Sequence, residues 1–74
     1  MKKAEVKITT EYIKLDQLLK FSGTASTGSI AKEMILDGIV SVNGEVCYMR
    51  GKKIRKTDIV SVAFNGETLE MTVI

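Results

Sequence analysis

Apolar and polar residues alternate near the start of the chain. Val6 and Ile8 are apolar, and the residues on either side of them are charged or carry a hydroxyl group. A repeat of two positions is typical of a strand with one buried face. We therefore expect a strand over residues 5–10.

Two later segments show the spacing of amphipathic helices, with apolar residues three and four positions apart. The first contains Leu15, Leu18 and Leu19, and the second contains Ile30, Ala31, Met34 and Ile35. The first helix should end before Gly23. The second should begin after a side-chain cap from Ser26 or Thr27, and it should end at Gly38, where a left-handed residue closes the helix.

Two Asn-Gly pairs, at residues 43–44 and 65–66, predict β-hairpins with two-residue type I′ turns, because both central residues of such a turn need a positive φ. A two-residue loop determines the register of its strands. The second turn should place Val62 opposite Leu69 on one apolar face. Two helices on one face of a small antiparallel sheet follow from this order of elements, so the expected fold class is α+β.

The composition excludes several classes of protein. Cys47 is the only cysteine and histidine is absent, which excludes an internal disulfide and a multi-cysteine zinc site and removes the commonest general base. No apolar run approaches the roughly 20 residues that cross a bilayer, and charged residues soon after Lys3 break any signal-peptide pattern. We expect a cytoplasmic, non-enzymatic protein without metal or cofactor, in which Cys47 packs as a small apolar residue.

Basic residues are concentrated in one segment. The net charge of the 74-residue chain is only +2, yet five of its eleven basic residues lie within residues 50–56, where there is no acidic residue. The rest of the chain is mildly acidic, so the positive field is local. Burying unpaired charges is prohibitive, so we expect a solvated loop. An ordinary soluble loop and an anion-binding loop both fit this pattern.

The start of the second helix is another candidate site for anions. Amides in the first turn of a helix have no partner within the helix, and the helix dipole is positive there. Gly28 and Ser29 supply such amides. Ser26 and Thr27 add hydroxyl groups that can donate to phosphate or ribose, although simple capping explains the same residues. Tyr48, next to the basic segment, is the best candidate for stacking on a base.

Residues 14–44 resemble the S4 RNA-binding family, whose pattern begins Arg-Leu-Asp, passes a Gly and a Ser-Arg pair at the second helix, and ends Gly-x-Val-x-Val-Asn-Gly. The matching positions are Lys14, Leu15, Asp16, Leu19, Gly23, Thr27, Ala31, Ile35, Gly38, Val40, Val42, Asn43 and Gly44. Lys14 stands where the family usually has arginine. Thr27 and Gly28 replace the Ser-Arg pair, which removes a guanidinium group. The basic segment resembles that of small stand-alone members, the YaaA/YbcJ-like branch.

This resemblance implies one S4-like domain over residues 1–74, with a motif core at 14–44, a basic loop at 50–56 and a C-terminal hairpin at 59–74. It implies a monomeric bacterial-type protein that binds ribosomal or transfer RNA without catalysis, in ribosome assembly or other translation-related RNA handling, with contacts from both helix N-termini and the hairpin region. Ribosomal particles are further expected partners. The residues expected to bind RNA are Lys14, Ser26, Thr27, Gly28, Ser29, Lys32, Asn43, Arg50, Lys52, Lys53, Arg55 and Lys56.

Two other classes of function remain open. A protein-interaction adaptor of β-grasp shape is compatible with one sheet and two helices, although sulfur carriers of that shape end in Gly-Gly and this chain ends in a strand-like pattern at residues 71–74. An RNA-modifying enzyme is the other class, and we expect no catalytic domain beside this one and therefore no catalysis. Pull-down after nuclease treatment separates an adaptor from a protein that contacts RNA directly.

Overall fold

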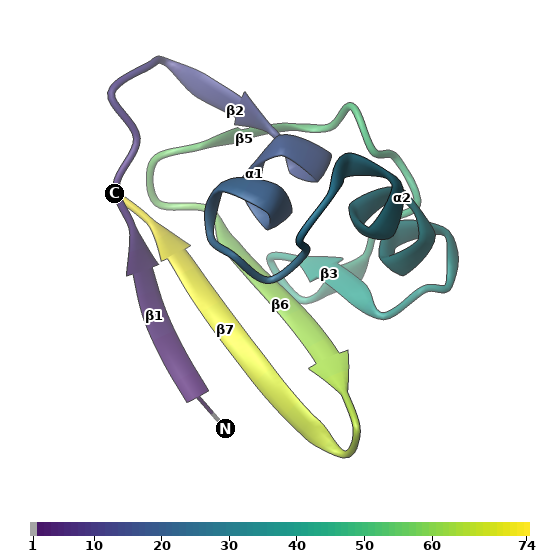
Figure 1. Cartoon of the computed structure of the whole chain (residues 1–74). Coiled ribbons are helices and arrows are strands. Elements are labelled where there is room, and N and C mark those ends of the chain that lie inside the picture. The colour runs from purple at the N-terminus through teal and green to yellow at the C-terminus, as the bar shows by residue number, and fades with distance from the viewer. Residues whose placement is uncertain (1) are drawn as a thin grey trace.

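Two helices and seven strands make up the part of the chain that the structure, a computed structural model, describes, which is residues 2–74 (Figure 1). In order they are β1 (Lys2–Val6), β2 (Tyr12–Lys14), α1 (Leu15–Phe21), α2 (Gly28–Leu36), β3 (Val40–Val42), β4 (Glu45–Val46), β5 (Lys53–Arg55), β6 (Ile59–Phe64) and β7 (Glu67–Val73). One sheet has five strands in the order β1-β7-β6-β3-β4, and β2 and β5 form a separate two-stranded sheet. The fold class is α+β, as expected.

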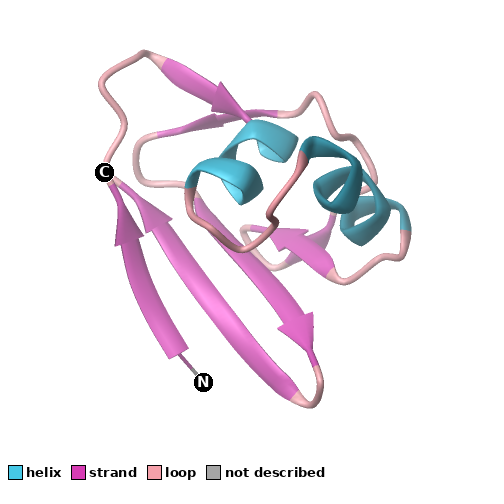
Figure 2. Ribbon diagram, in the orientation of Figure 1, coloured by secondary structure: helices cyan, strands magenta, loops and turns pink. Residues whose placement is uncertain are grey.

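The core lies between the helices and one face of the larger sheet, and Figure 2 shows both helices on that side. The buried apolar residues of the helices are Leu15, Leu18, Leu19, Ala31 and Ile35, and those of the larger sheet include Val40, Val42, Val60, Val62, Met71 and Val73. Successive residues of a strand point to opposite faces, so Val40 and Val42 of β3 and Val60 and Val62 of β6 all enter this core. Cys47 is half-buried and packs against it.

The larger sheet is mixed, so the expectation of an antiparallel sheet is wrong for one pair of strands. β1 pairs with β7 in parallel, with Val6 next to Val73, whereas β3, β4, β6 and β7 pair antiparallel. A tight turn forces the two strands that it joins to run antiparallel. β1 and β7 are the first and last strands of the chain, so no turn between them indicates their relative direction.

The first strand also has different bounds from those expected at residues 5–10. β1 ends at Val6, and Ile8 lies beyond it while remaining buried. The amide of Ile8 donates to the carbonyl of Ile74 at 2.9 Å, which holds this residue beside the end of β7. The alternating pattern therefore identified the buried side chains correctly, but not the residues that pair as a strand.

The second helix begins and ends through two local interactions. The hydroxyl Oγ1 of Thr27 accepts a hydrogen bond from the amide of Ile30 at 3.1 Å, so Thr27 is the N-cap. Gly38, with φ 77°, follows the C-cap residue Asp37 in the left-handed region. The first helix ends at Phe21, before Gly23. It has Lys14 at its N-cap and no side-chain cap, so its first amides need other acceptors.

The two Asn-Gly pairs lie between antiparallel strands. Residues 43–44 connect β3 to β4, and residues 65–66 connect β6 to β7, with φ between 50° and 87° at all four positions. Val62 lies opposite Leu69 in the second of these hairpins. β6 also pairs with β3, which brings both hairpins into one sheet.

Candidate nucleic-acid interface

The middle of the basic segment is a strand. β5 pairs antiparallel with β2, so that Tyr12 lies opposite Arg55, Ile13 opposite Ile54 and Lys14 opposite Lys53. Ile54 is fully buried and Ile13 packs against the core. The side chains of Tyr12, Lys14, Lys53 and Arg55 therefore share the outer face, and all four are exposed. We call this two-stranded sheet, residues 12–14 and 53–55, the basic ribbon.

The expectation of a loop over residues 50–56 is thus wrong at residues 53–55. The apolar side chain of Ile54 can leave water only if its neighbours point outward, and an extended strand achieves this with Lys53 and Arg55. The alternation of polar and apolar residues in both Tyr12-Ile13-Lys14 and Lys53-Ile54-Arg55 is the signal that could have found the two strands, although not their pairing. Arg50 and Lys56 lie in the turns on either side of it, and both are exposed.

The basic segment also caps the first helix with its backbone. The amide of Leu15 donates to the carbonyl of Lys52 at 2.9 Å, and the amide of Asp16 donates to the carbonyl of Arg50 at 3.1 Å. The amide of Gln17 donates to the carboxylate of Asp16 at 2.8 Å. Since these amides already have acceptors, the first turn of α1 does not offer them to a phosphate, although the resemblance implies contacts from both helix N-termini.

The first turn of α2 has a different arrangement. The amides of Ile30 and Ala31 both donate to Thr27, to its hydroxyl and its carbonyl respectively. Within residues 2–74, the amides of Gly28 and Ser29 have no such acceptor. The first turn contains no acidic residue, and Ser26, Thr27, Gly28, Ser29 and Lys32 are all exposed. A Cβ added at Gly28 would meet no atom within 4 Å, so the space above this turn is open.

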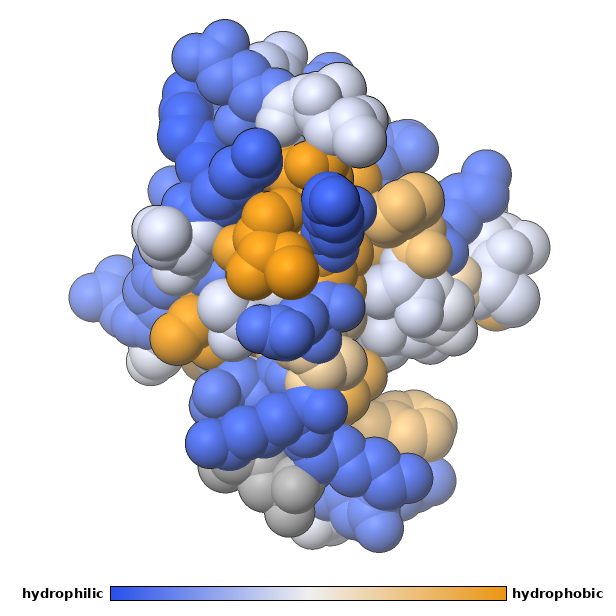
Figure 3. Space-filling view, turned by 90° about the vertical axis from the view of Figure 1, so that its left-hand side faces the viewer, coloured by the Kyte–Doolittle hydropathy of each residue, from blue (hydrophilic) through white to orange (hydrophobic). Residues whose placement is uncertain are grey.

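The basic ribbon and the first turn of α2 are connected through α1. α2 packs on α1, and α1 contacts both β2 and β5. Lys14, Lys53 and Arg55 are brought together directly by strand pairing. Figure 3 shows hydrophilic residues over the upper part of one face, where Figure 1 places the ribbon, and apolar residues nearer the middle.

The side chain of Asn43, a predicted RNA-binding residue, is used within the protein. Its amide nitrogen Nδ2 donates to Asp58 Oδ1 at 3.1 Å, and its oxygen Oδ1 accepts from the amide of Ile59 at 2.9 Å. Asp58 Oδ2 in turn accepts from the amide of Arg55 at 2.8 Å. This network ties the β3–β4 turn to the end of the basic ribbon.

The same network lowers the pKa of Asp58. The largest cause is the hydrogen bond from the backbone of Arg55, and the side chain of Asn43 and the charges of Lys52 and Arg55 act in the same direction, against the effect of burial. All of these partners favour the charged carboxylate. Asp58 therefore remains ionised beside the basic segment and helps to hold it in place.

This pKa shift predicts a dependence of stability on pH. A carboxyl group with a lowered pKa in the folded protein stabilises the fold above its unfolded pKa of about 3.9, and that contribution is lost as the pH falls through the folded pKa. Asp58→Asn should therefore cost stability at neutral pH but much less in strong acid. Urea unfolding of both proteins as the pH is lowered from neutrality measures this difference, and a difference that stays constant with pH would contradict the assignment.

Cations of the basic segment lie close to the ring of Tyr12, a residue for which the sequence predicted no role in binding. The ammonium nitrogen of Lys53 lies 4.9 Å from the centroid of the Tyr12 ring, and the guanidinium carbon of Arg55 lies 5.9 Å from it. Tyr48, the predicted stacking residue, is exposed, and its hydroxyl lies 3.2 Å from the position that a Cβ would take at Gly38. Tyr48 thus packs over the end of α2.

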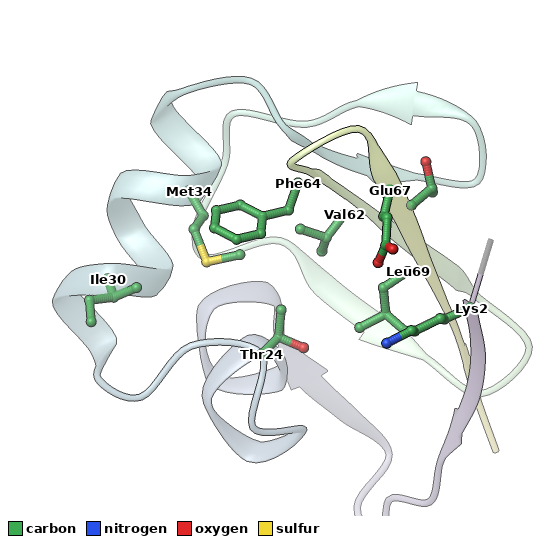
Figure 4. A pocket seen from close by; sticks show the side chains of 9 residues that line it. Lys2, Thr24, Ile30, Met34, Val62, Phe64, Glu67 and Leu69 are labelled. Atoms are coloured by element: carbon green, nitrogen blue, oxygen red, sulfur yellow. The ribbon is translucent and has the colours of Figure 1, made fainter.

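A hollow of about 280 Å³ between α2 and the β6–β7 hairpin has a different chemistry (Figure 4). Its lining includes the apolar side chains of Ile30, Met34, Val62, Phe64 and Leu69. The rest of the lining is Lys2, Thr24, Glu67 and Thr68. The carboxylate of Glu67 would repel a phosphate, and the apolar walls would remove part of its hydration. The hollow is therefore not part of the candidate interface for a polyanion.

The fold is that of a small α+β domain that exposes the basic ribbon on its surface. The S4 domain family matches residues 6–72, from the last residue of β1 to the penultimate residue of β7, and the chain therefore belongs to this family. S4 domains are generally RNA-binding and typically non-catalytic modules. A comparison with curated proteins finds no significant match. Within residues 2–74, neither helix has the length and apolar character needed to span a membrane.

Proposed function

We propose that this protein binds structured RNA, either ribosomal or transfer RNA, without catalysing a reaction. The observation that carries the proposal is the cluster of cations on the outer face of the basic ribbon. Lys14 lies directly opposite Lys53, and Arg55 lies two residues further along the same strand as Lys53. Like charges directly opposite each other destabilise a strand pair. An RNA phosphate placed between the two lysines relieves this repulsion.

The first turn of α2 supplies a second group of contacts. Gly28 and Ser29 present amides to a phosphate, and the hydroxyl groups of Ser26, Thr27 and Ser29 donate to phosphate or to a ribose 2′-hydroxyl. Lys32 adds a charge one turn further along. These groups take the place of the guanidinium that the family usually has at the position of Gly28.

The proposed biological role is in ribosome assembly or other translation-related RNA handling in the cytoplasm, as a monomer that associates with ribosomal particles. Phosphate contacts are insensitive to sequence, so the protein recognises the shape of its RNA and has a weak sequence preference. RNA that is crosslinked to the protein in cells and then sequenced would identify the target. Recovery of ribosomal or transfer RNA supports the role, and recovery of only messenger RNA would overturn it.

Direct binding is tested by titrating the purified protein into labelled RNA hairpins over a series of salt concentrations. If five phosphates are contacted, the logarithm of the affinity should fall with the logarithm of the salt concentration with a slope of about −3.5 to −4.5. Absence of binding at low salt, or a slope near zero, would contradict the proposal. A pull-down repeated after nuclease treatment tests the adaptor alternative, since partners that remain bound do not depend on RNA.

A further inference from the structure

We propose, on the basis of the RNA-binding function above, that the basic ribbon engages an unpaired nucleotide whose base stacks on Tyr12. The ligand class is then an RNA stem with a bulged or looped-out base, and not a continuous duplex. In this arrangement Lys14, Lys53 and Arg55 hold the phosphates on either side of the unpaired nucleotide. Tyr12 supplies contact with a base, which phosphate contacts alone cannot supply.

The position of the Tyr12 ring supports this inference. Ile13 and Ile54 point into the protein, so the ring of Tyr12 lies on the outer face of the ribbon, where it is 36% exposed. Arg55 is directly opposite in the register, and the side chains of Lys53 and Arg55 both approach the ring within 6 Å. The backbone at this point is also held, because the hydroxyl of Thr10 donates to the carbonyl of Tyr12 at 2.8 Å.

The chemistry of this group matches that of sites for single nucleotides. Such sites combine an aromatic side chain, on which a base stacks, with cations that follow the backbone, and Arg adds a planar group that can extend the stack. A base inside a duplex has both faces covered by its neighbours. Only a nucleotide that has left the stack can therefore place its base on Tyr12 while its phosphates reach the lysines.

The other exposed aromatic residues lack this combination in the described part of the chain. Phe64 borders the apolar hollow beside Met34. Tyr48 lies over Gly38. Phe21 borders a hollow formed with residues of β1 and β7. The ring of Tyr12, by contrast, lies close to the cationic groups of both Lys53 and Arg55.

A simpler role for Tyr12 would be to orient the two cations without touching RNA. The two roles predict different effects of removing the ring on the affinity for paired and for bulged RNA. If Tyr12 only orients Lys53 and Arg55, its removal weakens binding to every RNA equally. If a base stacks on the ring, removal weakens binding to RNA with an unpaired nucleotide and leaves the paired duplex unaffected.

The test uses two RNA stems of the same sequence, one fully paired and one with a single bulged 2-aminopurine, whose fluorescence falls on stacking. Tyr12→Leu should weaken binding to the bulged stem by about 5- to 150-fold and leave binding to the paired stem unchanged. Wild-type protein and Tyr12→Phe should quench the fluorescence, whereas Tyr12→Leu should not. Tyr48→Leu is the matched control and should behave as the wild type.

Each other outcome is also decisive. An equal loss on both stems by Tyr12→Leu, an unchanged affinity for the bulged stem, or quenching that depends on Tyr48 would overturn stacking on Tyr12 and leave RNA binding intact. Failure of the wild-type protein to bind either stem would instead overturn the proposed function. Thermal melting of each variant shows that it is folded, which is expected because Tyr12 and Tyr48 are exposed.

Discussion

Replacing Lys52, Lys53 and Arg55 by alanine should weaken RNA binding by roughly 100-fold at low salt, at about 1 kcal/mol for each lost exposed contact. The slope of the logarithm of the affinity against that of salt should become less steep by about 2 to 3. The three side chains are exposed, and the carbonyl of Lys52, which accepts from Leu15, is retained in the variant. The fold should therefore survive. Binding titrations over a range of salt concentrations give both quantities.

The control for this triple variant removes the same charge elsewhere. Lys2, Lys3 and Lys7 are exposed and lie in or next to β1, at one edge of the larger sheet. Their replacement by alanine changes the net charge equally but, at about 0.1 M salt, should leave most of the affinity and the slope in place, because charge effects are then screened over about 10 Å. Equal losses of affinity in the two triple variants would mean that RNA binding depends only on the net charge of the protein. That result would contradict the assignment of the basic ribbon as the RNA-binding surface.

Much of the larger fold was accessible from local patterns. The spacing of Leu15, Leu18 and Leu19 found the buried face of α1, and Thr27 and Gly38 marked the two ends of α2. Such signals are carried by residues that are close in the sequence. Propensity, capping and periodicity act over only a few positions, so they identify elements well and say little about which distant elements pair.

The long-range pairs were not accessible in this way. β2 and β5 are separated by both helices, and nothing near Lys14 states that it will lie opposite Lys53. The concentration of positive charge at residues 50–56 was visible in the sequence, but its attachment to the start of α1 through the carbonyls of Arg50 and Lys52 was not. Tyr12 was missed for the same reason, because only the pairing of β2 with β5 brings its ring close to Lys53 and Arg55.

Asn43→Ala should lower the free energy of unfolding by about 2 to 3 kcal/mol and the melting temperature by roughly 10 °C or more. The variant loses the two side-chain hydrogen bonds to Asp58 and Ile59. It also places an alanine at a φ of 52°, where a Cβ costs about 1 kcal/mol. Chemical denaturation and thermal melting give the size of the loss.

Asn65→Ala is the matched control, because Asn65 occupies the equivalent position of the other Asn-Gly turn at a φ of 50°. No side-chain hydrogen bond of Asn65 is found within residues 2–74, so this variant should lose only the conformational cost of about 1 kcal/mol. The difference between the two variants isolates the hydrogen bonds of Asn43. Equal losses would show that the Asp58 network contributes nothing. Because the side chain of Asn43 is already hydrogen-bonded within the protein, we expect it to act by holding the end of the basic ribbon in place. If folded Asn43→Ala instead lost as much RNA affinity as the triple variant, Asn43 would be a direct RNA contact.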